Sequence, residues 1–222
     1  RIKYYKFRND GIIAKARNYA ITLASGNIIA FLDSDDWWSP NKLSTSTSIL
    51  LEGYDFVYHD LYISKSIHQK SYKKKVKTRE LNFNPFEDLL NNGNAIATSS
   101  VVLNKEFIIN VSLFSEDIDL VGGEDYECWL KISNLTNKFR RINKTLGYYT
   151  IMQHNMTSYR RNIQYCNYIA HKYIVFKNQI PQWLLFTRGY SLFKEKNYKL
   201  ALNDLFRVKF GYVPLTIYLK KI

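Results

Sequence analysis

Three acidic side chains directly after a short apolar run carry the first candidate chemistry of this sequence. The run from Ile28 to Leu32 ends in Asp33, Asp35 and Asp36. A short run rich in Ile and Phe is typical of a buried strand. Ligands of open α/β sheets bind at the carboxyl ends of strands. The sequence therefore predicts a ligand site near the start of the chain.

Asp33 and Asp35 are separated by one residue, so an extended chain places both carboxylates on the same side. Carboxylate oxygens suit hard divalent cations. Mg²⁺ or Mn²⁺ is commonly held by one or two of them, with phosphate oxygens and water completing the coordination. A metal beside a nucleotide diphosphate would neutralise the charge of the leaving group. These two residues therefore predict a Mg²⁺ or Mn²⁺ site for a nucleotide diphosphate.

A second acidic pair, Glu124 and Asp125, follows two glycines at the start of a predicted helix over 124–134. Acids at this place stabilise a helix by interacting with its free backbone N–H groups and its dipole. Alternatively, one of them is a general base, which must be ionised and within reach of an acceptor hydroxyl. The position of the pair, after the second half of the predicted sheet, favours the functional interpretation.

Arg17 and His154 are further candidates. Arg17 lies on the apolar stripe of a helix predicted over 11–25, so either its stem covers apolar surface or its guanidinium points into a cleft. His154 lies in a polar loop after a predicted strand. A neutral imidazole there could be a third metal ligand, and a structural histidine is the alternative.

Alternating strands and helices must position these residues. We expect strands over 2–7, 28–32, 55–63 and 140–151, a further apolar segment over 95–103, and helices over 11–25, 39–53, 86–92 and 124–134. Helix signals predominate from Arg160 onward. The lysine-rich segment over 65–79 is either a solvated loop or a flap that faces an anion. This order predicts an α/β fold with a helical C-terminal extension.

The composition indicates a globular protein with an anionic partner. The 222 residues contain 32 Lys and Arg against 19 Asp and Glu, a formal net charge of +13. Nucleotide phosphates, anionic lipid and nucleic acid all match this charge. The sequence carries no nucleic-acid-binding motif, so we expect no nucleic acid partner. The segment over 206–222 mixes aromatic and basic residues, which suits either an interfacial segment on anionic lipid or a helix packed on the domain.

Cysteine usage and hydropathy favour a cytoplasmic location. Two cysteines, Cys128 and Cys166, do not suit a disulfide framework and predict a reducing compartment. No apolar run approaches the roughly 18 residues needed to span a bilayer. We therefore expect a cytoplasmic protein with peripheral contact at the inner face of the cell membrane.

Several of these residues together resemble bacterial family 2 glycosyltransferases. The matching motifs cover about residues 1–160 and are Asn9-Asp10-Gly11, Ala16-Arg17-Asn18, Phe31 to Trp37, Pro40-x-Lys42-Leu43, Gly123 to Leu130 and His154-x-x-x-Ser158. The resemblance starts at the third strand of the family, so the usual N-terminal strands are lacking. We expect a half-built nucleoside pocket and an exposed sheet edge in this chain.

The resemblance implies a GT-A fold, a Rossmann-like mixed sheet flanked by helices, over 1–158, with a helical extension over 159–222. It implies a metal-dependent, inverting glycosyltransferase that transfers a sugar from a nucleotide diphosphate donor. We expect this donor to be a UDP-sugar. The acceptor would be a glycan or lipid-linked, in bacterial surface polysaccharide biosynthesis. A non-catalytic fragment or paralogue that binds nucleotide or membrane is the alternative.

The resemblance also implies roles on the donor side of the site. Asp33 would contact the nucleoside or ribose, with Arg17 near the nucleotide and Asp36 among the donor-binding residues. Asp35 would bind Mn²⁺ or Mg²⁺ beside the diphosphate. His154 would complete the metal and diphosphate site.

On the acceptor side, the resemblance implies that Asp125 is the base that deprotonates the acceptor. Glu124 beside it would shape donor or acceptor binding. Trp37, Trp129 and the segment over 98–100 are expected neighbours of the acceptor.

Overall fold

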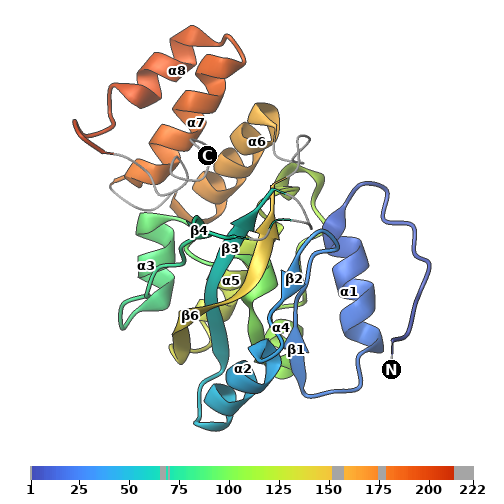
Figure 1. The fold of residues 1–222 in the computed structure, drawn as a ribbon. Helices are drawn as coiled ribbons and strands as arrows, with labels where there is room; N and C mark the ends of the chain where they lie inside the picture. The colour runs from blue at the N-terminus through green and yellow to red at the C-terminus, as the bar shows by residue number, and fades with distance from the viewer. Residues whose placement is uncertain (1, 66–68, 70, 152–157, 175–178, 213–222) are drawn as a thin grey trace.

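The computed structural model describes residues 2–65, 69, 71–151, 158–174 and 179–212. A six-stranded sheet lies between helices (Figure 1). Its strands are β1 (Ile28–Ala30), β2 (Trp37–Trp38), β3 (Phe56–Ser64), β4 (Lys75–Val76), β5 (Val102–Asn104) and β6 (Phe139–Thr150). The helices are α1 (Ile13–Leu23), α2 (Lys42–Leu51), α3 (Pro85–Asn92), α4 (Lys105–Asn110), α5 (Glu124–Ser133), α6 (Tyr159–Ile169), α7 (Gln182–Lys194) and α8 (Tyr198–Leu205). Three short helical segments are η1 (Thr98–Ser100), η2 (Ile118–Leu120) and η3 (Ala170–Ile174).

Strand β3 is the centre of a mixed sheet with the order β1-β5-β3-β6-β2. It pairs in parallel with β6 along almost its whole length and antiparallel with β5 at Phe56 and Val57. The short strand β4 pairs with Leu61 and Tyr62 further along the same edge of β3. Strand β1 is antiparallel to β5, so it runs in the same direction as β3. The acidic loop after β1 therefore lies at the carboxyl end of the central strands.

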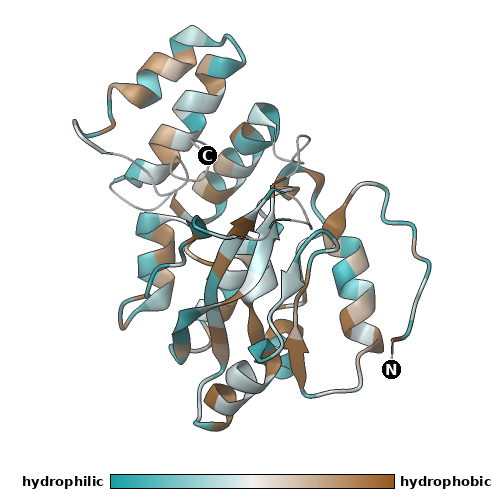
Figure 2. Cartoon of the chain, in the orientation of Figure 1, coloured by the Kyte–Doolittle hydropathy of each residue, from teal (hydrophilic) through white to brown (hydrophobic). Residues whose placement is uncertain are grey.

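The two faces of the sheet bury different sets of side chains. Phe56 and Tyr58 of β3 face the larger core, which also contains residues of α1, α3, α4 and α5. Val57, between them, faces the smaller core with Leu50 of α2. This alternation follows from the two-residue period of a strand. The apolar residues of the central strands are visible in Figure 2.

Most of the predicted elements are present, but the predicted strand over 2–7 is wrong. Residues 2–8 have no regular secondary structure and are exposed. An extended segment needs a neighbouring strand for its backbone hydrogen bonds, and no described strand pairs with the free edge of β1. Instead, the ring of Phe7 stacks on Tyr19 of α1 with ring centroids 4.6 Å apart.

Three helices, α6 to α8, lie together beyond the carboxyl end of the sheet (orange and red in Figure 1). Cys166, Ile169 and Trp183 belong to the same core as the sheet, and Trp183 Nε1 donates to the carbonyl oxygen of Leu90 at 2.8 Å. Helix α6 begins at Tyr159, and a division of the chain at 158/159 remains a prediction. None of the described helices is long and apolar enough to cross a membrane.

Candidate active site

The acidic loop after β1 is fixed from two directions. The backbone N–H of Asp33 donates to Ser99 Oγ of η1 at 3.0 Å. At the other end of the loop, Asp36 Oδ1 accepts the backbone N–H of Thr150 at 2.9 Å, and Thr150 Oγ1 donates to the carbonyl oxygen of Asp35. The loop is therefore tied both to η1 and to the end of β6.

Among the three acids of this loop, Asp35 is exposed and Asp36 is buried. Burial raises the pKa of Asp36 to about 6, and the charges of Asp35 and Asp33 add to this shift, against the hydrogen bond from Thr150. No described hydrogen bond uses the carboxylate of Asp35. The exposed carboxylate of Asp35 is thus open to a ligand, whereas Asp36 holds β6.

Arg17 of α1 joins the two acidic motifs. Its two terminal nitrogens donate separately to Asp33 Oδ1 at 2.7 Å and to Glu124 Oε1 at 2.8 Å. Its side chain is only 14% exposed. Burial alone would lower the pKa of Arg17, but the negative charges of Asp33 and Glu124 outweigh it and raise this pKa. The guanidinium of Arg17 therefore contacts both acidic motifs, and its central carbon also lies 5.5 Å from the centroid of the Phe114 ring.

Glu124 and Asp125 open α5 and make different contacts. Glu124 Oε2 accepts the backbone N–H of Gly122 at 2.7 Å, so this buried acid also closes the preceding glycine turn. Asp125 Oδ2 accepts the hydroxyl of Thr98 at 2.8 Å, and Oδ1 accepts the backbone N–H of Tyr126 at 2.6 Å. Both acids therefore have fixed orientations, one toward Arg17 and one toward η1.

The environment of Asp125 favours its protonated form relative to an exposed acid. Burial raises its pKa to about 6, and the charge of Glu124 adds to the increase. The charge of Arg17 and the hydrogen bonds from Thr98 and the Tyr126 backbone act in the opposite direction. A carboxylate with a pKa just below neutrality is ionised at pH 7 and still a strong enough base to accept a proton.

His154, which the sequence proposes as a metal ligand, lies outside the described residues. Within the described part of the chain, no group of three or more His, Cys, Asp or Glu side chains converges as a metal site. A Mg²⁺ or Mn²⁺ ion that takes one or two carboxylates and completes its shell with phosphate and water does not need such a group. The exposed carboxylate of Asp35 fits an ion of this kind. The chain turns between Asp33 and Asp35, since the backbone N–H of Asp36 donates to the carbonyl oxygen of Asp33 at 3.0 Å, so the extended arrangement expected from the sequence is wrong.

The prediction that Trp129 lies beside the acceptor is wrong. Its side chain is fully buried, and its ring packs against Phe31, Phe56 and Phe114 at 6.0, 4.9 and 5.8 Å between centroids. An apolar residue five positions into α5 points to the core because that face of the helix covers the sheet. Trp37 is half-buried on the strand beside the acidic loop.

Trp38 and Tyr165 support the site, and neither was predicted to have a role in it. Trp38 Nε1 donates to the carbonyl oxygen of Ser99 at 2.8 Å, and Lys42 Nζ lies 3.8 Å from the centroid of the Trp38 ring. Tyr165 of α6 packs directly against Gly123, before the acidic pair. The position of Trp38 directly after the acidic loop could have indicated its role in the site. Nothing in the local pattern around Tyr165 indicates a contact so far away in the sequence.

Comparison with known proteins gives a family match for the first part of the chain. Residues 1–97 match the model of "Glycosyl transferase family 2". The chain is 32% identical over 139 residues to the UDP-Glc:alpha-D-GlcNAc-diphosphoundecaprenol beta-1,3-glucosyltransferase WfaP of Escherichia coli, covering 62% of this chain and 51% of WfaP. It is 30% identical over 141 residues to the amylovoran biosynthesis glycosyltransferase AmsB of Erwinia amylovora, covering 61% and 46%. The chain thus spans about half the length of these curated relatives.

The fold also matches a solved structure. TarS of S. aureus superimposes with a TM-score of 0.52 at 18% identity, covering 82% of this chain and 31% of TarS. At this identity the likeness concerns the fold. It confirms the expected α/β class, a mixed sheet with flanking helices of the GT-A type.

Proposed function

Because residues 1–97 belong to glycosyl transferase family 2, we propose that this chain transfers a sugar from a nucleotide diphosphate donor to an acceptor hydroxyl with inversion. The observation that carries the proposal is the bridge from Arg17 to Asp33 and to Glu124. It brings the acidic loop after β1 and the acidic pair of α5 into one site. A donor site and a base beside each other are what a direct displacement requires.

The relatives suggest the substrates. WfaP is named for a UDP-glucose donor and a diphosphoundecaprenol-linked GlcNAc acceptor, and AmsB for amylovoran biosynthesis. We extend both to this chain: the donor is a UDP-sugar, with UDP-glucose the first to test, and the acceptor is a saccharide linked to a lipid through a diphosphate. The reaction belongs to the assembly of a bacterial surface polysaccharide.

On the donor side, Asp33 binds the nucleoside or ribose and Arg17 fixes its orientation by holding Oδ1 at 2.7 Å. Asp35, exposed at the same loop, holds Mn²⁺ or Mg²⁺ together with the diphosphate, and His154 is a further candidate ligand. When bound, the metal would neutralise the negative charge that develops on the leaving diphosphate. Asp36 acts indirectly, since it ties the loop to Thr150.

On the acceptor side, Asp125 is the general base. Its carboxylate accepts the proton of the acceptor hydroxyl while that oxygen forms the bond to the anomeric carbon and the nucleotide diphosphate leaves from the opposite side. Thr98 and the Tyr126 backbone hold the carboxylate in place. With a pKa of about 6 for Asp125, the rate should rise with pH through about 6 and then level off.

The transferase assay tests this proposal directly. The protein is incubated with UDP-glucose, Mn²⁺ and a short-chain alkyl diphosphate of GlcNAc, and the product is followed by mass spectrometry and its anomeric configuration by NMR. We expect a β-linked product from the α-configured donor, and a loss of at least about 10²-fold in rate for Asp125→Asn. Binding of UDP without transfer from any UDP-sugar would instead identify a non-catalytic nucleotide-binding protein.

A further inference from the structure

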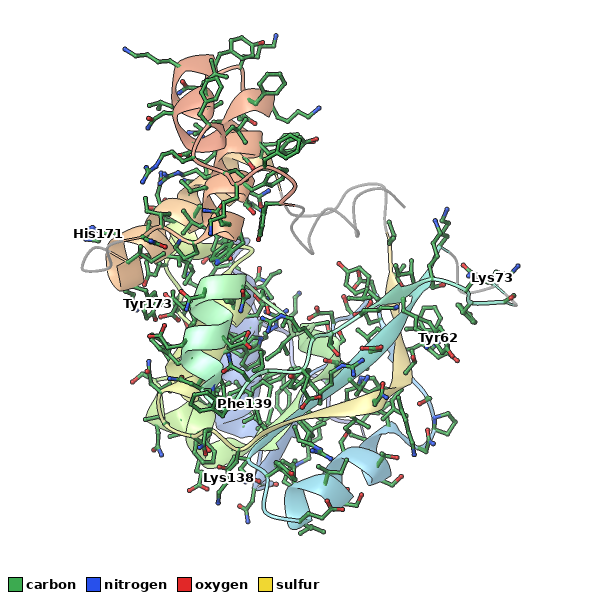
Figure 3. The ribbon with its side chains drawn as sticks, turned by 90° about the vertical axis from the view of Figure 1, so that its left-hand side faces the viewer. Tyr62, Lys73, Lys138, Phe139, His171 and Tyr173 are labelled. Atoms are coloured by element: carbon green, nitrogen blue, oxygen red, sulfur yellow. The ribbon has the colours of Figure 1, made fainter. Side chains whose placement is uncertain are left out.

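Tyr149 lies near the end of β6, at the end of the sheet that carries the acidic loop, and the mechanism above does not use it. Tyr148 pairs in register with Tyr62 of β3, and Tyr149 pairs with Ile63. Figure 3 shows Tyr62 at the end of the sheet opposite to Phe139, where β6 begins. Successive side chains of a strand project to opposite faces. Tyr149 and Tyr148 therefore lie on different faces of the sheet at this end.

Tyr149 shares its face of the sheet with η1. Gly147 lies two residues before Tyr149 and therefore faces the same side. It pairs with Trp38 of β2, and a Cβ atom added at Gly147 would lie 3.4 Å from the Trp38 ring. The indole of Trp38 donates to the carbonyl oxygen of Ser99 at 2.8 Å, so η1 packs on this face. The same segment holds the carboxylate of Asp125. Tyr149 therefore projects from the face on which the proposed base is held.

The hydroxyl of Tyr149 is close to both acidic motifs. Burial raises the pKa of Tyr149 to about 12, and four negative charges add to this increase, in the order Asp36, Asp35, Asp33 and Asp125. Because the interaction of two charges weakens with distance, the hydroxyl lies near the acidic loop and within range of the proposed base. With its pKa raised in this way, the phenol keeps its proton at neutral pH.

The proton of this hydroxyl is available to a ligand. The Tyr149 side chain is only half-buried, and within the described part of the chain its hydroxyl forms no hydrogen bond. Arg17, by contrast, already binds Asp33 and Glu124. A diphosphate next to so many carboxylates needs hydrogen-bond donors, because like charges repel. A phenol that keeps its proton can donate to a phosphate oxygen, and a hydrogen bond to an ionised group is about twice as strong as one between neutral groups.

We propose that the hydroxyl of Tyr149 donates a hydrogen bond to the diphosphate of the donor, at the phosphate that carries the sugar. The inference rests on the proposed function and adds a catalytic residue to the donor side. The base must lie next to the anomeric carbon, and Tyr149 is within range of both the base and the loop that binds the diphosphate.

This hydrogen bond stabilises the leaving group. The bond between the anomeric carbon and the bridging phosphate oxygen breaks, and its electron pair stays on that oxygen. The negative charge on this phosphate therefore increases during the reaction, and a donor fixed beside it binds the transition state more strongly than the ground state. Tyr149 keeps its proton throughout, since Asp125 is the group that accepts the proton of the acceptor.

Calorimetric titration with UDP in the presence of Mn²⁺ tests the assignment. The variant is Tyr149→Phe, which keeps the ring and removes only the hydroxyl. The matched control is Tyr148→Phe, the same change one residue earlier and on the opposite face. We expect the dissociation constant of UDP to rise about tenfold in Tyr149→Phe and to stay unchanged in Tyr148→Phe. UMP, which lacks the phosphate that carries the sugar, should bind all three proteins equally. Both variants should keep the melting temperature of the wild type, because neither loses a described hydrogen bond.

Transfer from UDP-glucose is the second readout, and kcat should fall by about tenfold or more in Tyr149→Phe alone. The inference is overturned if Tyr149→Phe binds UDP like the wild type, if UMP loses as much affinity as UDP, if Tyr148→Phe weakens UDP binding equally, or if kcat is unchanged. Absence of UDP binding to the wild type would overturn the proposed donor site as well. Weaker binding of UDP to Tyr149→Phe, with no sugar transfer by the wild type, would support this assignment and contradict the proposed function.

Discussion

The carboxylate of Asp125 accepts hydrogen bonds from Thr98 and the Tyr126 backbone, yet burial still raises its pKa to about 6. The ordinary pKa of an aspartate, in the unfolded chain, is about 3.9. Between these values the folded state binds a proton that the unfolded state has lost. The free energy of unfolding therefore falls as the pH rises from about 4 to about 6. At neutral pH the ionised carboxylate of Asp125 therefore lowers the stability of the folded protein.

Asp125→Asn should consequently increase stability while it removes activity. The neutral amide avoids the cost of a buried charge, so we expect the free energy of unfolding at pH 7.5 to rise by about 1 to 3 kcal/mol. The gain should shrink toward pH 4.5, where Asp125 is protonated in the folded wild type. Urea denaturation of the wild type and the variant at both pH values measures this gain in stability. Glu52→Gln, at an exposed position, is the control and should change stability little at either pH.

Arg17 makes two ion pairs that a single ammonium cannot replace. In Arg17→Lys one of Asp33 and Glu124 loses its partner, and the Glu124 side chain is only 7% exposed. We expect a loss of about 2 kcal/mol in the free energy of unfolding and weaker nucleotide binding. Thermal denaturation and UDP titration measure the two effects. Arg8→Lys is the matched control, because the Arg8 side chain is 93% exposed; an equal loss there would contradict the account.

At the scale of elements, the start of α5 is packed against α6. A Cβ atom added at Gly123 would lie 2.2 Å from the ring of Tyr165. The backbone of Gly123, with φ of −138°, is open to other residues, so only this close contact requires glycine. The helical extension thereby supports the turn that presents Glu124 and Asp125.

Gly123→Ala should therefore displace either α6 or the acidic pair. We expect a fall of about 1 to 3 kcal/mol in the free energy of unfolding together with a lower rate of sugar transfer. Gly26→Ala is the control, since the closest atom to its added Cβ is 3.7 Å away. If Gly123→Ala behaves like Gly26→Ala in both stability and rate, α6 does not support the site.

The sequence predicts those helices and strands whose formation depends on the residues within the element and directly beside it. The alternating pattern over 55–63 and the glycine turn before α5 led to elements within two residues of the observed bounds of β3 and α5. Strand β2, only two residues long, has too few residues to show a period, and it forms because Trp37 and Trp38 pair with β6. The segment over 2–7 has a strand-like composition, but composition cannot show that a pairing partner is lacking.

The same limit applies to the candidate site. The acids themselves were identified because their types and spacing carry chemistry. Their arrangement was not, since the bridge through Arg17 and the support from Thr98 and Ser99 join segments that are distant in the sequence. Such contacts are set by tertiary packing, which a one-dimensional pattern does not contain.

At the scale of the whole molecule, charge and exposed apolar residues suit an anionic membrane surface. The net charge is +13. Tyr198, Leu202 and Phe206 recur every four residues along α8 and its end, and they are 52%, 47% and 83% exposed. Lys199 and Arg207 are exposed nearby. Apolar side chains flanked by basic ones are typical of peripheral membrane segments, which would bring the site to a lipid-linked acceptor.

Co-sedimentation with vesicles that contain phosphatidylglycerol tests this contact. Wild type should bind and be released as the salt concentration rises, because the attraction is partly electrostatic. Phe206→Glu should lower the bound fraction several-fold. Phe83, which is 92% exposed in the segment before α3, provides the matched control: Phe83→Glu should bind like wild type. Equal losses in both variants would show that charge alone, and not α8, determines the binding.

The proposed function requires that the acidic loop after β1 binds a metal and a nucleotide diphosphate. Its most direct test is calorimetric titration of UDP, with and without Mn²⁺, into the wild type and Asp35→Ala, whose exposed side chain can be removed without loss of a described contact. We predict binding that depends on Mn²⁺ and is lost in Asp35→Ala. Absence of UDP binding to the folded wild type with Mn²⁺, or binding that Asp35→Ala leaves unchanged, would contradict the account.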